Sequence, residues 1–297
     1  MPPLAELVRR HGLRPDKRLG QHFLFDPRIL ARIARAAGPL EGRTVLEVGP
    51  GPGGLTRALL AAGAAEVVAV ERDPRCLEAL AELAAAAGPR LRLVAGDALA
   101  FDVTGLAPPG ELVIVANLPY NIGTELLLRW LERIDAIALM VLLFQKEVAQ
   151  RLVATAGTRD YGRLSILAQS VCRIERLFDL PPAVFTPPPK VTSTLVRLVP
   201  RPDRPCPELL ARLSRITAAA FGQRRKMLRQ SLRSLCPDPE KPLAELGIAP
   251  TARAETLPPE TFLALAARLS PPRSAAVPPA EPGTAERIPK DKADGDA

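Results

Sequence analysis

The chain has 297 residues, of which 47% are hydrophobic, and it carries a formal net charge of +8. This length allows one large domain with a smaller one beside it, and the positive charge favours a polyanionic partner such as nucleic acid. Four widely spaced cysteines, no Cys-x-x-Cys motif and only two histidines argue against a disulfide framework and a structural metal site.

The N-terminal segment lacks the continuous apolar core of a secretory signal. The longest apolar stretch, 136–144, is far too short to cross a bilayer. We therefore expect no membrane association and a cytoplasmic, reducing location.

Short apolar runs alternate with Ala/Leu-rich helical stretches between residues 44 and 144. Nearly continuous hydrophobicity predicts strands that are covered on both faces, and alternation with helices predicts a parallel, doubly wound α/β sheet. The expected strands are 44–48, 66–70, 91–94, 112–116 and 136–144, with two more at 172–180 and 194–198 on either side of a loop with five prolines.

The composition changes near Pro200, where a proline-rich linker begins. Residues 208–235 have helical periodicity, and a last short helix is expected at 262–269. We predict a sheet domain over 1–200, a small helical domain over 201–270, and a disordered tail over 271–297, which contains six prolines and almost no large apolar residues.

A glycine-rich loop follows the first expected strand and opens a helix. Gly49, Gly51 and Gly54 fit the pattern G-x-G-x-x-G, in which glycines let the backbone turn tightly and approach a ligand. Glu71 ends the second strand, where a carboxylate can accept hydrogen bonds from both hydroxyls of a ribose. A nicotinamide-linked dehydrogenase and an S-adenosylmethionine enzyme would both use these features.

Polar residues also follow the third and fourth strands. The Asp97 carboxylate can accept a hydrogen bond from the amino group of a bound adenine. Capping of the next turn is an alternative role. Asn117 begins the run Asn-Leu-Pro-Tyr, in which the Asn oxygen and a nearby carbonyl can accept the N–H bonds of an exocyclic amine. Tyr120 can stack on the base that carries this amine.

A short segment before the sheet, Gln21 to Leu24, combines two polar and two apolar side chains. Gln21 and His22 can contact a cofactor from above, with Phe23 and Leu24 packing as a lid. A purely structural histidine is the alternative interpretation of His22.

Five motifs occur together in a fixed order: Gln-His-Phe-Leu at 21–24, Glu-Val-Gly-Pro-Gly at 47–51, Asn-Leu-Pro-Tyr at 117–120, Phe-Thr-Pro-Pro-Pro-Lys-Val-Thr-Ser at 185–193 and Phe-Gly-Gln-Arg-Arg-Lys at 221–226. This set closely resembles the KsgA/RsmA family of small-subunit ribosomal RNA adenine dimethyltransferases, from about residue 4 to residue 269. Position 22 is one at which relatives can hold Asn.

The resemblance implies a Rossmann-like class I methyltransferase that dimethylates N6 of two adjacent adenosines in the 3′-terminal hairpin of 16S rRNA. The expected cofactor is S-adenosylmethionine, and the expected partner is 16S rRNA in a small-subunit precursor, bound by a monomer. With the glycine pattern, the expected cofactor-binding residues are His22, Leu24, Gly49, Gly51, Glu71, Asp97 and Asn117.

The methyl group of a sulfonium is already activated, so the enzyme mainly needs to align the acceptor nitrogen. Asn117 and the carbonyl of Leu118 or Pro119 are expected to hold N6 for direct in-line displacement. Tyr120 is expected to stack on one face of a flipped adenine and Phe185 on the other. The stiff proline loop favours a displayed Phe185 ring over ordinary core packing.

The segment 201–236 contains nine basic and two acidic residues. A solvated basic helix is one interpretation, but an adjacent adenine site favours contact with RNA phosphates. The expected RNA-binding residues are Arg224, Arg225, Lys226, Arg229 and Arg233.

Three rival functions share part of this pattern. An Erm-type enzyme, which methylates adenine in 23S rRNA, shares the glycine and Asn-Leu-Pro-Tyr motifs, but the motifs at 185–193 and 221–226 favour the small-subunit family. A binding protein that only keeps the methylase fold would not need both motifs intact. A dehydrogenase leaves the Asn-Leu-Pro-Tyr run and the basic segment unexplained.

Overall fold

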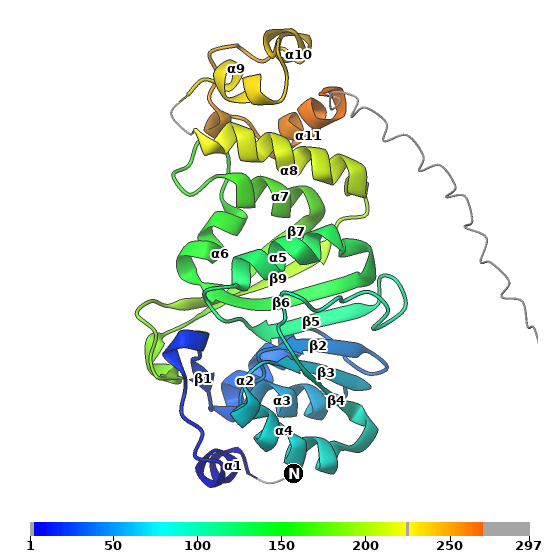
Figure 1. Ribbon diagram of the computed structural model, residues 1–297, viewed down its shortest axis with the longest axis vertical. Coiled ribbons are helices and arrows are strands. Elements are labelled where there is room, and N and C mark those ends of the chain that lie inside the picture. The colour runs from blue at the N-terminus through cyan, green and yellow to red at the C-terminus, as the bar shows by residue number, and fades with distance from the viewer. Residues whose placement is uncertain (1–2, 224–225, 270–297) are drawn as a thin grey trace, which may run out of the picture.

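The computed structural model describes residues 3–223 and 226–269, and a seven-stranded mixed sheet lies at its centre (Figure 1). The strands of this sheet are β2 (Thr44–Val48), β3 (Glu66–Glu71), β4 (Leu91–Ala95), β5 (Leu112–Asn117), β6 (Ile137–Gln145), β7 (Cys172–Leu180) and β9 (Ser193–Pro200). Their spatial order is β4-β3-β2-β5-β6-β9-β7.

All seven expected strands are present, and β2 to β6 are parallel as predicted. Only β9 is reversed, because it runs antiparallel to both of its neighbours, β6 and β7. The connection between β7 and β9 contains no α-helix that would carry the chain back to the other end of the sheet, so the two strands pair as neighbours in opposite directions.

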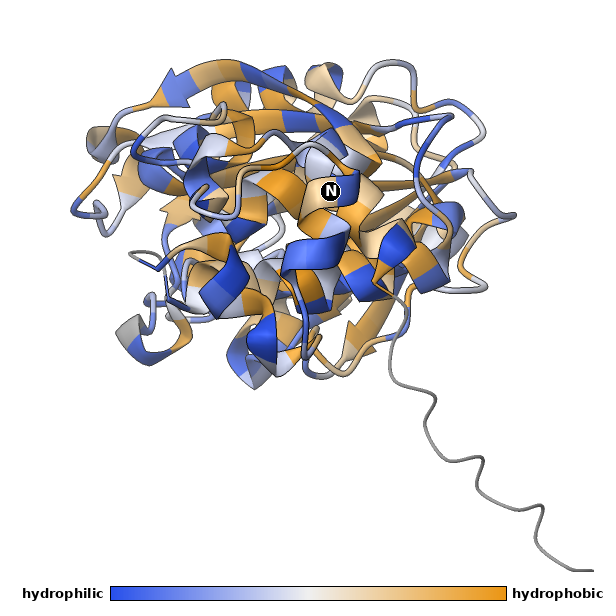
Figure 2. Cartoon of the chain, turned by 90° about the horizontal axis from the view of Figure 1, so that it is seen from above, coloured by the Kyte–Doolittle hydropathy of each residue, from blue (hydrophilic) through white to orange (hydrophobic). Residues whose placement is uncertain are grey.

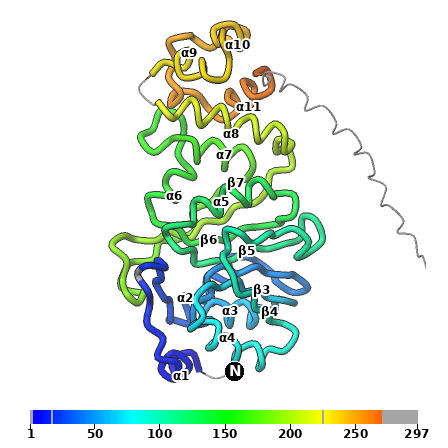
Figure 3. Tube along the Cα trace, viewed as in Figure 1, coloured from blue at the N-terminus to red at the C-terminus, as the bar shows by residue number. Residues whose placement is uncertain are grey.

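A second, two-stranded sheet was not expected from the sequence. It joins β1 (Phe23–Leu24) to β8 (Phe185–Thr186) in antiparallel register. Figure 3 shows the N-terminal segment, in dark blue, beside the yellow-green loop that carries β8. Strands of two residues are too short to show a periodic pattern, so the sequence offers no signal for this contact.

Helices cover both faces of the large sheet. One face packs on α2 (Pro27–Ala36), α3 (Gly54–Ala61) and α4 (Pro74–Ala87), and the other on α5 (Gly123–Glu132), α6 (Lys146–Val153) and α7 (Arg163–Val171). Alternate residues of β5 enter opposite clusters: Val113 and Val115 lie in one, and Ile114 and Ala116 in the other. The helices carry hydrophobic and hydrophilic residues in alternation, as amphipathic covering helices do (Figure 2).

An N-terminal helix, α1 (Leu4–Arg10), packs against α4 through a small third cluster that includes Leu7, Phe23 and Cys76. The segment that follows α1 runs toward the carboxyl ends of the parallel strands, where the pocket described below lies.

The C-terminal part is helical, but its boundaries differ from the expected ones. It consists of α8 (Pro207–Gly222), α9 (Leu228–Ser231), α10 (Glu240–Glu245) and α11 (Pro259–Arg268). The range 208–235, predicted from its helical periodicity, is interrupted, because α8 ends at Gly222 and Met227 pairs with Arg253 in an isolated β-bridge. Buried residues of α8 and α11 share one core cluster with the sheet, and the proposed division near residue 201 remains a prediction.

The predicted disordered tail, 271–297, lies outside the described residues. Within 3–223 and 226–269, every helix is too short or too polar to span a bilayer. The same residues contain no group of three or more His, Cys, Asp or Glu arranged to hold a metal ion.

Candidate active site

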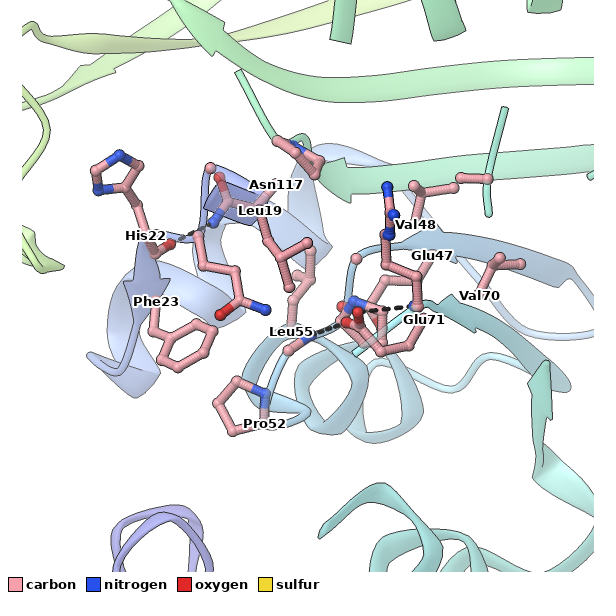
Figure 4. Close-up of a pocket in the computed structure, with 18 of the residues that line it drawn as sticks. Leu19, His22, Phe23, Glu47, Val48, Pro52, Leu55, Val70, Glu71 and Asn117 are labelled. Carbon is pink, nitrogen blue, oxygen red and sulfur yellow. Dashed lines mark hydrogen bonds between the residues drawn. The ribbon is translucent and has the colours of Figure 1, made fainter. Parts of the chain in front are cut away.

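A pocket lies where β2, β3, β4 and β5 end, and the segment 18–24 forms part of its wall (Figure 4). It brings together all the residues expected to bind the cofactor, namely His22, Leu24, Gly49, Gly51, Glu71, Asp97 and Asn117. Parallel strands present their carboxyl ends at one edge of a sheet, which is the usual ligand-binding edge of such folds.

The glycine loop has a backbone conformation that is unfavourable for residues with a side chain. Gly49, Gly51 and Gly53 have φ values of 65°, 54° and 82°, all in the left-handed region. A Cβ added at Gly51 would meet the Phe23 ring at 3.0 Å, so the N-terminal segment packs directly on the loop. Gly49, Gly51 and Gly54 of this loop line the pocket without a side chain.

Glu71 is 5% exposed, and its carboxylate accepts hydrogen bonds from three main-chain amides. Its Oε1 accepts hydrogen bonds from the amides of Arg72 and Asp73, both at 2.9 Å, and its Oε2 accepts one from Gly51 at 3.0 Å. Burial raises the pKa of this carboxyl. A carboxylate has about four acceptor sites, so Glu71 can bind both hydroxyls of a ribose only if one of these three main-chain contacts opens.

Of the two roles that the sequence leaves open for Asp97, the structure shows the turn cap. Its Oδ1 accepts a hydrogen bond from the Leu99 amide at 2.9 Å, which is a turn cap. Its Oδ2 lies 3.7 Å from the guanidinium of Arg72, and both side chains line the pocket. The cap therefore fixes the carboxylate while one oxygen remains available to a ligand amine.

Asn117 is oriented by a main-chain contact. Its Nδ2 donates to the His22 carbonyl oxygen at 3.1 Å (Figure 4). A carbonyl only accepts, so this contact assigns the nitrogen of the amide and leaves Oδ1 as the other end. Oδ1 has no hydrogen-bond partner within residues 3–223 and 226–269 and is available to accept an N–H bond.

The neighbouring carbonyls differ in availability. The Pro119 oxygen already accepts hydrogen bonds from the amides of Ile122 and Gly123, at 3.2 and 3.0 Å, where α5 begins. The Leu118 carbonyl accepts none from the described residues, and the residue as a whole is 2% exposed, with its side chain in the core. Of the two carbonyls, that of Leu118 is therefore the one without a main-chain partner, and that of Pro119 fixes the turn.

Tyr120 lies beside the pocket and is held through its hydroxyl. The Oη atom is 2.5 Å from Oγ of Ser193, at the start of β9. Burial raises the pKa of the Tyr120 phenol. The His22 ring lies 5.2 Å from the Tyr120 ring, at an interplanar angle of 31°.

Phe185 does not have the displayed ring expected from the proline loop. It is 3% exposed and packs in the cluster that includes Leu24, Leu180 and Leu195. The expectation of a displayed ring is wrong, because pairing of β8 with β1 turns Phe185 into this core. A stiff loop limits where a side chain can point, but strand pairing decides the direction.

Comparison with known proteins settles which of the rival classes this geometry belongs to. The sequence matches the family described as Ribosomal RNA adenine dimethylase over residues 12–270. The chain belongs to this family. The membership confirms the predicted class I methyltransferase fold and S-adenosylmethionine as its cofactor, and it excludes the dehydrogenase interpretation.

Similar proteins carry related names. "Ribosomal RNA small subunit methyltransferase A" of Agrobacterium fabrum is 56% identical over 270 residues, 90% of this chain and 97% of its own, and that of Rhodospirillum rubrum is 55% identical over 266 residues, 90% and 92%. A dimethyladenosine transferase from Plasmodium falciparum has a TM-score of 0.68 at 26% identity and covers 82% of this chain and 96% of its own. The 23S rRNA methyltransferase ErmE has a TM-score of 0.61 at 30% identity and covers 83% and 99%.

Glu47, in this dimethylase pocket, was missed by sequence reasoning, and Gln21, expected to contact a cofactor from above, has both ends of its amide engaged. Glu47 is 1% exposed, accepts the Thr56 hydroxyl at 2.6 Å, and has its pKa raised to about 8 by burial. Its signal was a carboxylate inside an otherwise apolar strand. Gln21 donates to Asp73 at 2.9 Å and accepts from the Asp16 amide at 2.9 Å, so its amide fastens the N-terminal segment to α4.

The basic residues expected to bind RNA are only partly described. Arg224 and Arg225 lie outside the described residues. Arg229 pairs with Glu240 at 3.1 Å, whereas Lys226 and Arg233 have no ion-pair partner within the described part of the chain. α9 and α10 lie at the end of the molecule opposite α4 and α1 (Figure 1).

Proposed function

We propose that this chain transfers methyl groups from S-adenosylmethionine to N6 of two adjacent adenosines in the 3′-terminal hairpin of 16S rRNA. The observation that carries the proposal is the Asn117 amide. It lies at the end of β5 and lines the pocket, and its Oδ1 is free to accept a hydrogen bond from an amine. The curated relatives named above, at 55–56% identity, support the small ribosomal subunit as the target.

The residues that line the pocket fit the cofactor chemically. The glycine loop brings main chain to the pocket wall, Glu71 offers a carboxylate to the ribose, and Asp97 offers one to the adenine amine. When bound, S-adenosylmethionine supplies a methyl group that its sulfonium has already activated. The protein then needs neither a nucleophilic side chain nor a metal for the transfer.

Two acceptors hold the nitrogen of the target base. The lone pair of adenine N6 is delocalised into the ring, so the amine is a poor nucleophile. Asn117 Oδ1 and the Leu118 carbonyl each accept one N–H bond, which favours a pyramidal nitrogen whose lone pair points at the methyl group. Once one methyl is attached, N6 keeps a single hydrogen, so only one acceptor still acts in the second transfer.

Tyr120 supplies the stacking surface for the flipped adenine. Stacking of a base on an aromatic ring contributes about 1–3 kcal/mol, which offsets much of the cost of taking the base out of its helix. Phe185 can stack on the other face only if the β1–β8 pair opens, because its ring is buried in this structure. We therefore assign the first stacking contact to Tyr120.

We further propose that the chain acts as a monomer. A small-subunit precursor as substrate supports a cytoplasmic location. Lys226, Arg229, Arg233 and the preceding Arg224 and Arg225 supply positive charge for RNA phosphates.

The test is methylation of small subunits that lack these modifications, with tritiated S-adenosylmethionine and mapping of the labelled nucleotides. We expect label on two adjacent adenosines of the 3′-terminal hairpin, and dimethyladenosine after digestion. Label in large-subunit RNA would instead establish an Erm-type target. A calorimetric titration without cofactor binding would point to a binding protein that has lost catalysis.

A further inference from the structure

We infer that the imidazole of His22 positions the target-base side of the site, where it holds Tyr120 and the proline loop together. This inference rests on the proposed function and deepens it. It changes the role expected from the sequence, in which the His22 side chain reaches toward the cofactor.

The His22 ring makes two contacts, and both lead away from the cofactor residues. Its Nδ1 lies 2.7 Å from the Pro187 carbonyl oxygen, in the proline loop. Because a carbonyl only accepts, Nδ1 carries the proton in this contact. The ring also lies 5.2 Å from that of Tyr120 at 31°, so the two rings are near enough to pack.

The main-chain carbonyl of His22 points toward Asn117, away from the side on which the ring lies. The His22 carbonyl accepts the hydrogen bond from Asn117 Nδ2 that orients the amide. Figure 4 shows this carbonyl directed toward Asn117, while the imidazole points away from Glu47, Glu71 and the interior of the pocket. Residue 22 thus lines the pocket through its main chain and serves a different region through its ring.

These contacts place His22 between the parts that would meet the target base. Tyr120 is held at its hydroxyl by Ser193 and at its ring by His22. The Pro187 carbonyl follows directly on β8, which pairs with β1 next to His22. Loss of the imidazole would therefore free both the Tyr120 ring and the end of the proline loop, while the Asn117 contact to the main chain would persist.

Fixing Tyr120 in advance has a defined benefit for methyl transfer. A ring that is already held loses less conformational freedom when a base stacks on it, and the base then lies at a fixed angle to the donor. His22 is accordingly a positioning residue, and its effect should be seen in base capture and transfer rate and not in cofactor affinity.

Three substitutions in the full-length chain separate the contacts. His22→Ala removes both, His22→Phe keeps a ring against Tyr120 but loses the donor, and His22→Asn keeps a short amide donor but loses the ring. His11→Ala is the matched control, since the only other histidine contacts Glu82 at 2.6 Å, near α1. Thermal melting of each variant checks that it is folded.

The readouts are the dissociation constant of S-adenosylmethionine, the rate of a single methyl transfer, and the fluorescence of an RNA hairpin that carries 2-aminopurine at a target adenosine. For His22→Ala we expect cofactor affinity within about twofold of wild type, a transfer rate reduced about tenfold or more, and a weaker fluorescence increase on binding. His22→Phe and His22→Asn should lie between His22→Ala and wild type.

The inference is overturned if His22→Ala weakens cofactor binding about tenfold while the 2-aminopurine signal stays at the wild-type level. It is also overturned if all three folded variants match His11→Ala in rate and fluorescence. Failure of the proposed function looks different, because wild type itself would then leave the small-subunit adenosines unlabelled. If His22→Ala does not fold, His22→Asn and His22→Phe decide the question by the same comparison.

Discussion

At the scale of single residues, the members of the Asn-Leu-Pro-Tyr run differ in which of their polar atoms already have a hydrogen-bond partner. Asn117 has its nitrogen engaged and its oxygen open, and the Leu118 carbonyl is open while that of Pro119 is occupied. The two open acceptors are therefore adjacent in sequence. A two-acceptor grip on an amine is consistent with a methyltransferase that needs alignment more than acid–base chemistry.

Replacement of Asn117 by alanine should abolish most of the methyl transfer. The variant loses one of two N6 acceptors and also leaves the His22 carbonyl without its partner, so we expect a rate at least about 100-fold lower. Single-turnover transfer of tritiated methyl measures the effect, and a separate titration reports cofactor binding. Activity within about twofold of wild type, with binding intact, would remove Asn117 from the mechanism.

Glu47 should make stability depend on pH. Its pKa of about 8 in the folded chain lies above the ordinary value of 4.5, so the folded state binds the proton more tightly than the unfolded chain does. The stabilisation from this group is fully present below pH 4.5 and is lost as the pH rises toward 8. Its size is on the order of a few kcal/mol at most.

Urea unfolding of wild type and Glu47→Gln at pH 5, 6, 7 and 8 measures this effect. Glutamine cannot ionise, so we expect the stability of the variant relative to wild type to increase steadily over this range. Thr56 can still donate its hydroxyl to the amide oxygen, which keeps the contact in the variant. Parallel stability curves for the two proteins would show that Glu47 has an ordinary pKa.

At the scale of elements, the N-terminal segment and the glycine loop form one unit. Phe23 packs against Gly51, Gln21 is bonded to Asp73, and β1 pairs with β8. The wall of the cofactor pocket thus comes from segments that are distant in sequence. Asp73 also caps α4, and the hydrogen bond from Arg75 helps lower the Asp73 pKa to about 2.

Gly51→Ala should weaken cofactor binding more than it weakens the fold. The new Cβ would lie 3.0 Å from the Phe23 ring and would displace either the ring or the loop. Gly38→Ala is the matched control, because Gly38 also has a positive φ, of 76°, but has no atom within 4 Å of the added Cβ.

Both substitutions should cost about 1–2 kcal/mol of unfolding free energy through the left-handed backbone alone. Only Gly51→Ala should also raise the dissociation constant of S-adenosylmethionine, by about tenfold or more. Calorimetric titration of the two variants makes the comparison. Equal cofactor affinities would mean that the Phe23 contact does not shape the pocket.

At the scale of the whole molecule, the pocket and the basic residues lie in two separate regions. The pocket lies at the carboxyl edge of the sheet, whereas the basic helical part lies beyond α7 and α8, toward α9 and α10 (Figure 1). An RNA substrate long enough to reach both regions would be held through its phosphates at one and through its base at the other.

RNA binding should weaken steeply as salt increases, because phosphate contacts release counterions. Lys226→Ala and Arg233→Ala should each lower the slope of log affinity against log salt by about 1. Arg92→Ala is the control, since Arg92 pairs with Glu66 on β3 and β4, at the opposite end of the molecule. An affinity that is flat between low and moderate salt would contradict the phosphate-binding role.

Removal of the chain after Ser270 should leave folding and catalysis intact. The family match ends at residue 270, and the described core ends with α11 and Leu269. Thermal melting and methyl transfer of the truncated chain should equal those of the full chain within error. A clear loss of activity would assign a role to the proline-rich tail.

The sequence by itself determined which segments form the strands of the large sheet and which residues lie at its ligand-binding edge. Strand-length apolar runs and turn residues are local signals, so β2 was predicted to the residue, and Glu71, Asp97 and Asn117 were placed at strand ends. The ordered motifs likewise identified the family, because they fix residue types at positions where chemistry restricts them.

Only the tertiary structure decided how side chains use those positions. The burial of Phe185 and the direction of the His22 ring both depend on pairing of β1 with β8, two segments about 160 residues apart. Such pairing depends on contacts across the chain and leaves no periodic trace in either segment. The sequence therefore named the residues of the site, and long-range packing set which of their atoms face the substrate.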